Sequence, residues 1–301
     1  MYARAAFDEF ALRFTRAEFL SDCATELDID LDLLRTQMSH SAEEARFGLD
    51  FLRGVDLGGK RVLEVGSGAG ILSAWLSLHD IDITPLEPRG IGFDHRLHIL
   101  KRIWSENHLP LDRLLTVPAS GLEPSTHGMF DLIFSVNVLE HVDDLPQTFA
   151  AMGSVLAPGG VSRHTCPNYV VPYEPHYGLP LLPAWPTLSA WFAGVARADL
   201  WQSLNFITYF DVRRLARANR QAVRFERKTL HAAFARLGTD PMFQQRHPLL
   251  ARASASVRAT GALALLARVP PALATSMVFE CEHRFQAHED TPPGDAPVTH
   301  R

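Results

Sequence analysis

The stretch "RVLEVGSGAGILSAWLSLH", residues 61–79, holds the clearest structural signal in this chain. Residues 61–65 are a short, mainly apolar run bounded by glycine, which is typical of a buried strand, and residues 71–79 indicate a helix. Between them, Gly66, Gly68 and Gly70 form a turn whose backbone can adopt positive φ and approach a ligand closely. In open α/β sheets, ligands bind at such turns, outside the carboxyl ends of the strands. We therefore expect a ligand site here.

The same texture extends outward along the chain. Strands are predicted at "IDITPLEP" (81–88), "RLLTV" (113–117), "FDLIFSVNVL" (130–139) and "VSRHTCP" (161–167), so the last of these is the fifth strand. Helices are predicted between them, for example at "HRLHILKRIWSENH" (95–108). Strands that alternate with helices of this length predict a Rossmann-like α/β fold, a mostly parallel sheet with helices on both faces.

Three further regions surround this core. Residues 1–55 are predicted to form an N-terminal helical cap, and residues 56–285 the main domain. Within that domain, the alternation stops after the fifth strand, and residues 169–207 are predicted to be a substrate-side insertion, because a loop of this length is usually functional. The Pro-rich polar tail, residues 286–301, is predicted to be disordered.

The composition excludes some classes of partner and compartment. The formal net charge is −5 without a Lys/Arg-rich block, which disfavours nucleic acid. The three cysteines are far apart, which indicates a reducing compartment without a disulfide framework. No apolar run of about 20 residues and no signal-like N-terminus occur, so we expect a cytoplasmic protein with no integral membrane segment; peripheral membrane contact stays open. The oligomeric state is not determined.

The glycine turn itself discriminates between ligand classes. A dinucleotide fingerprint, G-x-G-x-x-G, requires a third glycine at position 71, which is Ile71 here. The spacing is instead G-x-G-x-G, with Glu64 two residues ahead, and a carboxylate beside the turn suits a ligand that bears an ammonium group. Glu87 ends the next strand, 21 residues after Gly66, where an acid can bind both ribose hydroxyls of an adenosine. An NAD-dependent oxidoreductase stays an alternative, because NAD also carries a ribose.

A third motif, "FDLIFSVNVLEHVDD" (130–144), extends the pattern. With it, the chain resembles the class I S-adenosylmethionine-dependent methyltransferases, in particular the group of the ubiquinone-pathway O-methyltransferases. "VLEVGSGAG" is similar to the family's first motif, "LEP" to its acidic second and "LAPGG" to a later one. The resemblance covers about residues 48–168, with a looser match onward to residue 283. It implies S-adenosylmethionine as cofactor and methyl transfer as activity.

The resemblance also implies roles for individual residues. The residues implied around the methionine part of the cofactor are Glu64, Gly66, Ser67, Gly68 and Gly70; Glu87 is implied at the ribose, and Asn137 and Val138 along the cleft. One segment departs from the family: an acidic residue that often contacts adenine is absent from "VPASGLE" (117–123). Ser120, or the backbone beside it, is the substitute that the sequence offers.

Transfer to a hydroxyl also needs a base. A general base works best with a pKa near the working pH, which favours histidine. The candidates near the strand ends are His176, His141 and His164, with Glu174 as an orienting partner or alternative base. His176 is preferred because the insertion places Tyr and Trp around it, and aromatic walls are typical of small-molecule pockets.

Structural roles compete with these functional ones. Glu140 and His141 can instead cap the following helix or anchor its loop, and Cys166 suits a small core position. His95 and His98 have helical spacing but no nearby carboxylate or cysteine partner, so no metal site is predicted. The favoured hypothesis is an S-adenosylmethionine-dependent O-methyltransferase that acts on a small molecule or glycan; a module that binds the cofactor without catalysis is the other alternative.

Overall fold

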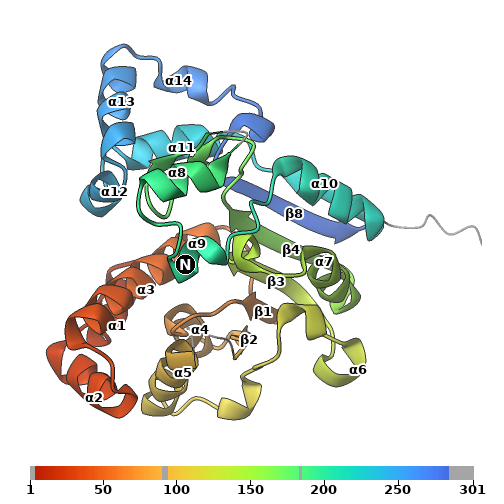
Figure 1. Ribbon diagram of the computed structural model, residues 1–301. Helices are drawn as coiled ribbons and strands as arrows, with labels where there is room; N and C mark the ends of the chain where they lie inside the picture. The colour runs from red at the N-terminus through yellow and green to blue at the C-terminus, as the bar shows by residue number, and fades with distance from the viewer. Residues whose placement is uncertain (1–3, 90–93, 183–184, 285–301) are drawn as a thin grey trace, which may run out of the picture.

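A six-stranded sheet forms the centre of the molecule, in the strand order β2-β1-β3-β4-β8-β7 (Figure 1). The computed structural model describes residues 4–89, 94–182 and 185–284. The strands are β1 (Arg61–Val65), β2 (Asp82–Leu86), β3 (Phe130–Val136), β4 (Leu156–Cys166), β7 (Gln221–Phe225) and β8 (Met277–His283). The first four are mutually parallel, and β8 is antiparallel to both of its neighbours. The predicted Rossmann-like, mostly parallel sheet is confirmed.

The strand predicted at 113–117 is wrong. Only Leu115 pairs with the sheet, through a single bridge to Leu86, and a 3₁₀ turn, η1 (Leu111–Arg113), precedes it. The Leu115 N–H donates to the Pro85 carbonyl oxygen at 2.9 Å, but Pro85 has no N–H to return toward this segment. A ladder therefore cannot extend along β2, which becomes the edge of the sheet. The insertion consequently follows the fourth strand along the chain, β4.

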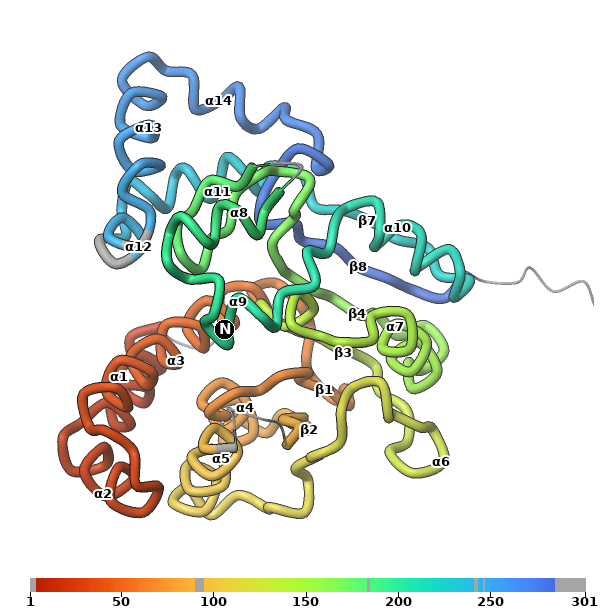
Figure 2. The backbone as a smooth tube through the Cα atoms, in the orientation of Figure 1, coloured from red at the N-terminus to blue at the C-terminus, as the bar shows by residue number. Residues whose placement is uncertain are grey.

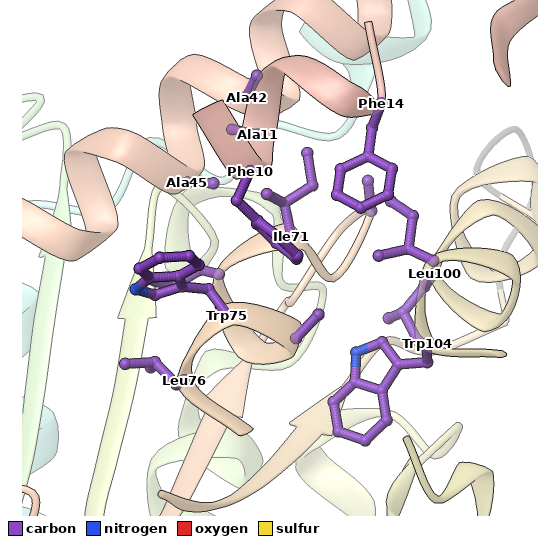
Figure 3. Packing of buried hydrophobic residues seen from close by; sticks show 14 of the residues in the cluster. Phe10, Ala11, Phe14, Ala42, Ala45, Ile71, Trp75, Leu76, Leu100 and Trp104 are labelled. Atoms are coloured by element: carbon purple, nitrogen blue, oxygen red, sulfur yellow. The ribbon is translucent and has the colours of Figure 1, made fainter. Parts of the chain in front are cut away.

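The N-terminal helices cover one face of the sheet together with two helices of the alternating region. These helices are α1 (Arg4–Arg13), α2 (Ala17–Leu27), α3 (Leu31–Phe51), α4 (Ile71–Ser77) and α5 (Asp94–Glu106). Figure 3 shows Phe10 of α1 beside Trp75 of α4, and their ring centroids lie 5.3 Å apart. Phe7 meets the same indole edge to face at 5.5 Å. The predicted cap is helical, and its side chains share one apolar core with the sheet.

The opposite face is covered by α7 (Leu145–Ser154) and α10 (Tyr209–Ala218). Strand β3 serves both faces, because its side chains alternate: Leu132 and Phe134 belong to the first core, and Ile133 to the second. The predicted helices on both faces are therefore present. Cys166 and Cys281 are buried in this second core, and all three cysteines are free, as predicted.

The insertion leaves β4 and folds into a short hairpin and two helices. These are β5 (Tyr173–Glu174), β6 (Leu179–Pro180), α8 (Pro186–Phe192) and α9 (Asp199–Gln202). They enclose a small apolar cluster of their own, in which Trp201, Leu181 and Ala190 are buried, with Tyr169 and Tyr177 packed against it. The predicted absence of a helix over residues 169–177 is confirmed, because Pro172 and Pro175 prevent one.

A group of helices follows β7 and lies beside the insertion (Figure 2). We call residues 227–273 the C-terminal helical lobe; it contains α11 (Thr229–Arg236), α12 (Pro241–Arg246), α13 (Pro248–Ala259), α14 (Leu263–Leu266) and the 3₁₀ turn η4 (Pro271–Leu273). A hydrogen bond of 2.7 Å between the Tyr173 hydroxyl and Nδ1 of His247 joins the insertion to this lobe. The predicted disordered tail, 286–301, lies outside the described residues.

Candidate active site

A cavity of about 530 Å³ lies at the carboxyl ends of the parallel strands, between the glycine turn, α3 and the insertion. It brings together most of the residues that the sequence singled out. Those that line it are Glu64, Gly66, Ser67, Gly68, Gly70, Glu87, Ser120, Asn137, Val138, His141 and His176. They come from segments more than 100 residues apart along the chain. The cavity is the candidate active site.

The glycine turn adopts the backbone that its sequence suggests. Gly66, Gly68 and Gly70 all have positive φ, at 73°, 55° and 70°. A Cβ at Gly66 would lie 2.4 Å from a methyl group of Val138, so the turn packs tightly against the end of β3. A Cβ at Gly68 would meet nothing within 4 Å. Gly66 therefore serves packing, whereas the space over Gly68 is open to a ligand.

Two carboxylates lie on the same side of the cavity as this turn. Glu87 accepts a hydrogen bond of 2.8 Å from the Gly68 N–H, which holds its carboxylate against the glycine turn. Glu64 is buried, and its Oε2 has no hydrogen-bond partner. Burial, with a smaller contribution from the Glu87 charge, raises the pKa of Glu64 to about 8, despite a hydrogen bond with Ser73. A buried carboxylate with one unpartnered oxygen suits a cationic ligand group.

The third segment of the cavity wall follows β3. Asn137 takes a left-handed φ of 53°, and its N–H donates to the Thr165 carbonyl oxygen at 2.9 Å. Left-handed backbone is uncommon outside glycine but comparatively frequent for asparagine. This bend ends the strand and turns Val138 toward the glycine loop. Ser120 lines the cavity from the turn η2 (Ala119–Gly121), so the segment that departs from the family pattern also borders the site.

His176 enters the cavity from the insertion with a partner behind it. Its Nδ1 lies 2.5 Å from Oε1 of Glu174, whose side chain is fully buried and accepts two more hydrogen bonds, from the Tyr169 hydroxyl and the Tyr177 N–H. Burial lowers the pKa of His176, but the hydrogen bond and charge of Glu174, together with Glu140, outweigh it, so the net shift is upward from 6.5. Glu174 does not border the cavity and orients His176 from outside it.

His141 lies next to His176, with ring centroids 5.2 Å apart, and its Nδ1 is 2.8 Å from the Ser203 hydroxyl. Burial lowers the pKa of His141 to about 3, so it is a weak base near neutral pH. Helix α7 is capped by Asp144, which accepts from the Gln147 N–H at 2.9 Å. The helix-capping alternative for Glu140 and His141 is therefore wrong.

Glu140 completes a cluster with the two histidines. Its carboxylate is buried, without a hydrogen-bond partner, and lies 3.8 Å from Nε2 of His176. One ligand atom from each of Glu140, His141 and His176 lies within 4.8 Å of the others, a spacing at which the three could hold a metal ion. No metal site was expected from the sequence, because His176 lies 35 residues after the adjacent Glu140 and His141 and only the fold brings it to them. His98 contacts Glu26 at 3.2 Å, whereas His95, on the same helix, borders the cavity.

Two expectations about the site are corrected. His164 lies within the sheet, with Nδ1 2.8 Å from the Ser135 hydroxyl and its ring against Phe279, so it cannot reach an acceptor. The predicted aromatic walls are also wrong. None of the described Tyr and Trp side chains in 169–201 borders the cavity, because they pack the insertion internally, orient Glu174 or point outward.

Comparison with known proteins decides the family. A family model described as "Methyltransferase domain" matches residues 36–237, about two thirds of the chain. The chain belongs to this methyltransferase family. The family assignment, with the four sequence motifs on this sheet, makes it a class I S-adenosylmethionine-dependent methyltransferase. This assignment rules out the alternative of an NAD-dependent oxidoreductase.

The methyltransferase is also similar to individual proteins, over different shares of its length. It is 35% identical over 218 residues to an uncharacterized protein of Mycobacterium tuberculosis, covering 68% of this chain and 73% of that protein. It is 33% identical over 107 residues to a ubiquinone biosynthesis O-methyltransferase of Marinobacter nauticus, covering 35% of this chain and 43% of that one. A solved S-adenosylmethionine-dependent methyltransferase from Mesorhizobium loti aligns with 79% of this chain and 97% of its own at 15% identity, with a TM-score of 0.49.

The residues of the cavity fit the cofactor of this methyltransferase family. The open space over Gly68 accommodates a ligand close to the backbone, and Oε2 of Glu64 and Oγ of Ser67 are buried polar atoms without a protein partner. A ligand with an ammonium group and hydroxyl groups would satisfy them. Glu87, already hydrogen-bonded to the Gly68 N–H, borders the same cavity, and a carboxylate there could accept hydrogen bonds from ribose hydroxyls.

One wall of the cavity comes from helix α3, none of whose residues was predicted as part of the site. Helix α3 contributes Gln37, Ser41, Glu44 and Gly48, and Oε1 of Gln37 is buried without a partner. These positions follow one another at intervals of four, three and four residues, so they share one face of the helix. This spacing of polar and small residues along one helix face was a sequence signal that the face could border a ligand cavity. Helix α5 also contributes His95 and Arg96.

Proposed function

We propose that the methyltransferase transfers the methyl group to a hydroxyl oxygen of a small molecule or glycan, with His176 as general base. The observation that carries the proposal is the Glu174–His176 pair. Glu174 binds Nδ1 of His176 outside the cavity, and the imidazole itself borders the cavity beside His141. With the Nδ1 proton held by the carboxylate, Nε2 is the nitrogen that accepts a proton.

The chemistry divides between cofactor and protein. S-adenosylmethionine, when bound, supplies a methyl group on a good leaving group. The chain must orient the acceptor, exclude water and remove the hydroxyl proton. In this proposal Nε2 of His176 would take the proton of the acceptor O–H, so that the acceptor oxygen could receive the methyl group that the cofactor would supply. His176 suits the role better than His141, because its pKa lies above 6.5 whereas that of His141 is about 3.

Relatives support oxygen as the accepting atom. Several of them are named ubiquinone biosynthesis O-methyltransferases, and the match covers less than half of the first of these. The part of the cavity formed by the insertion and α3 therefore sets the acceptor of this chain independently. Its lining includes the polar side chains Gln37, Ser41 and Glu44 among apolar ones such as Met38 and Leu200, and these polar groups suit an acceptor that carries several hydroxyl groups.

The test is turnover with S-adenosylmethionine across a panel of small-molecule and glycan hydroxyl acceptors. His176→Ala should reduce the turnover rate by about 10²- to 10⁴-fold and leave binding of the demethylated cofactor product unchanged. His98→Ala, on the outer side of α5, is the matched control and should have no effect. Unchanged turnover in His176→Ala would show that His176 is not the general base. Tight cofactor binding without turnover on any acceptor would favour the binding-module alternative.

A chelation experiment separates a base from a metal ion in the same cluster. If His176 acts as a base, EDTA leaves turnover unchanged. Turnover that is lost with EDTA and restored by a divalent cation would instead assign Glu140, His141 and His176 to a metal site. Metal content of the purified protein, measured by mass spectrometry, checks the same point without an acceptor.

A further inference from the structure

The insertion carries a group of exposed apolar side chains that its own fold does not use. Leu182, Trp185, Leu188, Trp191 and Phe192 all lie within eleven residues, on and just before α8. Trp191 is 67% exposed and Phe192 72%, and their rings pack edge to face at 5.2 Å. Ala190, on the same helix, is fully buried in the insertion's core. Helix α8 therefore has one face fixed to the protein and another that is apolar and in solvent.

The neighbouring C-terminal helical lobe adds more exposed apolar side chains. Leu249, Leu265 and Leu273 are each more than half exposed. The insertion and this lobe together hold eight of the fourteen large hydrophobic side chains that are exposed among the described residues. Since scattered single exposures are normal, the concentration of them in two adjoining segments is the informative feature.

The charge of the C-terminal helical lobe is opposite to that of the whole chain. Residues 227–273 contain seven Lys and Arg and a single Asp, a net charge of +6, whereas the chain carries −5. Five of these cations are exposed and form no salt bridge with any described residue: Arg227, Lys228, Arg252, Arg258 and Arg268. The insertion contains Arg197 and two acids, Asp199 and the buried Glu174, so it adds little charge of either sign. The remainder of the molecule is therefore strongly acidic, so the charge is distributed asymmetrically.

We propose that helix α8 and the C-terminal helical lobe form a docking surface for an anionic lipid bilayer. Trp and Phe side chains partition into the interfacial region of a bilayer, while basic side chains are attracted to anionic headgroups. The acidic remainder of the chain is repelled by the same headgroups, so the charge asymmetry orients the molecule as well as attracting it. No helix of the described residues is long and apolar enough to cross a membrane, and the surface is suited to peripheral contact.

The positive charge of the lobe favours an anionic bilayer over a second copy of the chain as the partner of this surface. A second copy of the chain would bring an equally basic lobe against this one, which is unfavourable unless the acidic remainder faces it. The docking insertion also carries His176 and Leu200, which border the cavity. Binding would thus hold one wall of the active site close to the bilayer surface.

Vesicle flotation of the full-length chain tests the docking surface. The protein should float with vesicles of 30% phosphatidylglycerol in phosphatidylcholine and not with pure phosphatidylcholine, and high salt should release it. The double variant Trp191→Ser/Phe192→Ser should weaken binding by about tenfold or more. The matched control, Leu12→Ser/Leu33→Ser, removes two side chains of similar exposure from the N-terminal helices and should bind as the wild type does.

A second variant tests the charges. Arg252→Gln/Arg258→Gln/Arg268→Gln should weaken binding by about fivefold for each charge removed and reduce its salt dependence. Absence of flotation with anionic vesicles at low salt overturns the proposal, as does equal loss in the Leu12/Leu33 control. Self-association that disappears in Trp191→Ser/Phe192→Ser would assign the surface to a second copy instead. These measurements need no acceptor, so their outcome is independent of the proposed O-methyl transfer.

Discussion

At the residue scale, the site depends on acidic side chains with different surroundings. Glu64 is buried with one oxygen, Oε2, unpartnered and has a pKa of about 8, whereas Glu174 is buried among three donors. Burial raises the pKa of Glu174, but its hydrogen bonds and the charge of His176 lower it more, so the net shift is downward. Glu64 is therefore neutral at pH 7 until a cation approaches, and Glu174 stays ionised.

Replacing Glu174 should change the pH dependence of turnover. Activity of the wild type should rise as His176 loses its proton, with an inflection above pH 6.5, because the Glu174 charge stabilises the imidazolium. In Glu174→Gln that charge is absent, so the inflection should move to lower pH. Turnover measured from pH 5 to 9 checks this. An unshifted inflection would contradict the positioning role, and a merely structural role would lower activity equally at every pH.

The same pair makes a prediction about stability. His176 has a raised pKa in the folded state, so its contribution is present at low pH and is lost as the pH rises through that value, above 6.5. Glu174 has a lowered pKa, so its contribution is lost as the pH falls through that value, below 4.5. The wild type should therefore exceed Glu174→Gln in stability most clearly between about pH 4.5 and 6.5. Denaturant titrations across this range measure the difference.

Replacing Glu64 should weaken cofactor binding and remove a proton release. At pH 7 the carboxyl group is mostly protonated, and an ammonium group beside it favours the ionised form, so binding should release up to about one proton per site. Glu64→Gln should bind about 10- to 100-fold more weakly and release none. Calorimetry in two buffers of different ionisation enthalpy measures both quantities. Proton release that persists in Glu64→Gln would assign it to another group.

At the element scale, the strand–turn–helix unit of residues 61–77 and the end of β3 determine each other's position. Gly66 packs directly against Val138, and the N–H groups of Gly66 and Ser67 both donate to the Leu86 carbonyl oxygen, at 2.8 and 3.0 Å. The turn is thereby tied to β2 and β3 at once. Its glycine spacing is consequently a packing requirement as well as a ligand requirement.

Gly66→Ala should lower the free energy of unfolding by about 3 kcal/mol or more, through positive φ and the clash with Val138. Gly159→Ala is the matched control, because Gly159 also has positive φ, at 78°, but a Cβ there would meet nothing within 4 Å. It should cost about 1–2 kcal/mol, the conformational cost alone. Equal losses in urea unfolding would show that the Val138 contact contributes nothing.

At the scale of the whole molecule, the N-terminal helices share one apolar core with the sheet. Phe7 and Phe10 of α1 pack against Trp75 of α4, and α3 lines the cavity. The boundary predicted near residue 55 marks a change of texture along the chain, from helices alone to alternating strands and helices. A core that crosses this boundary couples the acceptor wall to the stability of the cofactor site.

Phe7→Ala should therefore destabilise the whole chain by about 3–5 kcal/mol, with one unfolding transition. Far-ultraviolet circular dichroism and tryptophan fluorescence should report the same midpoint. The control Leu12→Ala, on the same helix but 53% exposed, should stay within about 0.5 kcal/mol of the wild type. Two separate transitions in Phe7→Ala would show instead that the cap folds as an independent unit.

The sequence by itself determined the sheet class, the family and most of the proposed cofactor residues, because these depend on local patterns. Apolar strands bounded by glycine, the G-x-G-x-G turn and the acid ending the second strand are contiguous signals, each read within about ten residues. The strand predicted at 113–117 failed because its pairing depended on Pro85, far away in sequence.

Only the tertiary structure decided which side chains meet at the acceptor end. It placed His176 between Glu174 and Glu140, excluded His164 by burying it in the sheet, and added the polar face of α3. It also showed that the aromatic residues of the insertion turn inward or outward, away from the cavity. The physical reason is that the pKa of a side chain depends on its burial and on charges brought close by other segments. Neither these surroundings nor the distance to a ligand can be derived from the spacing of residues along a short stretch of sequence.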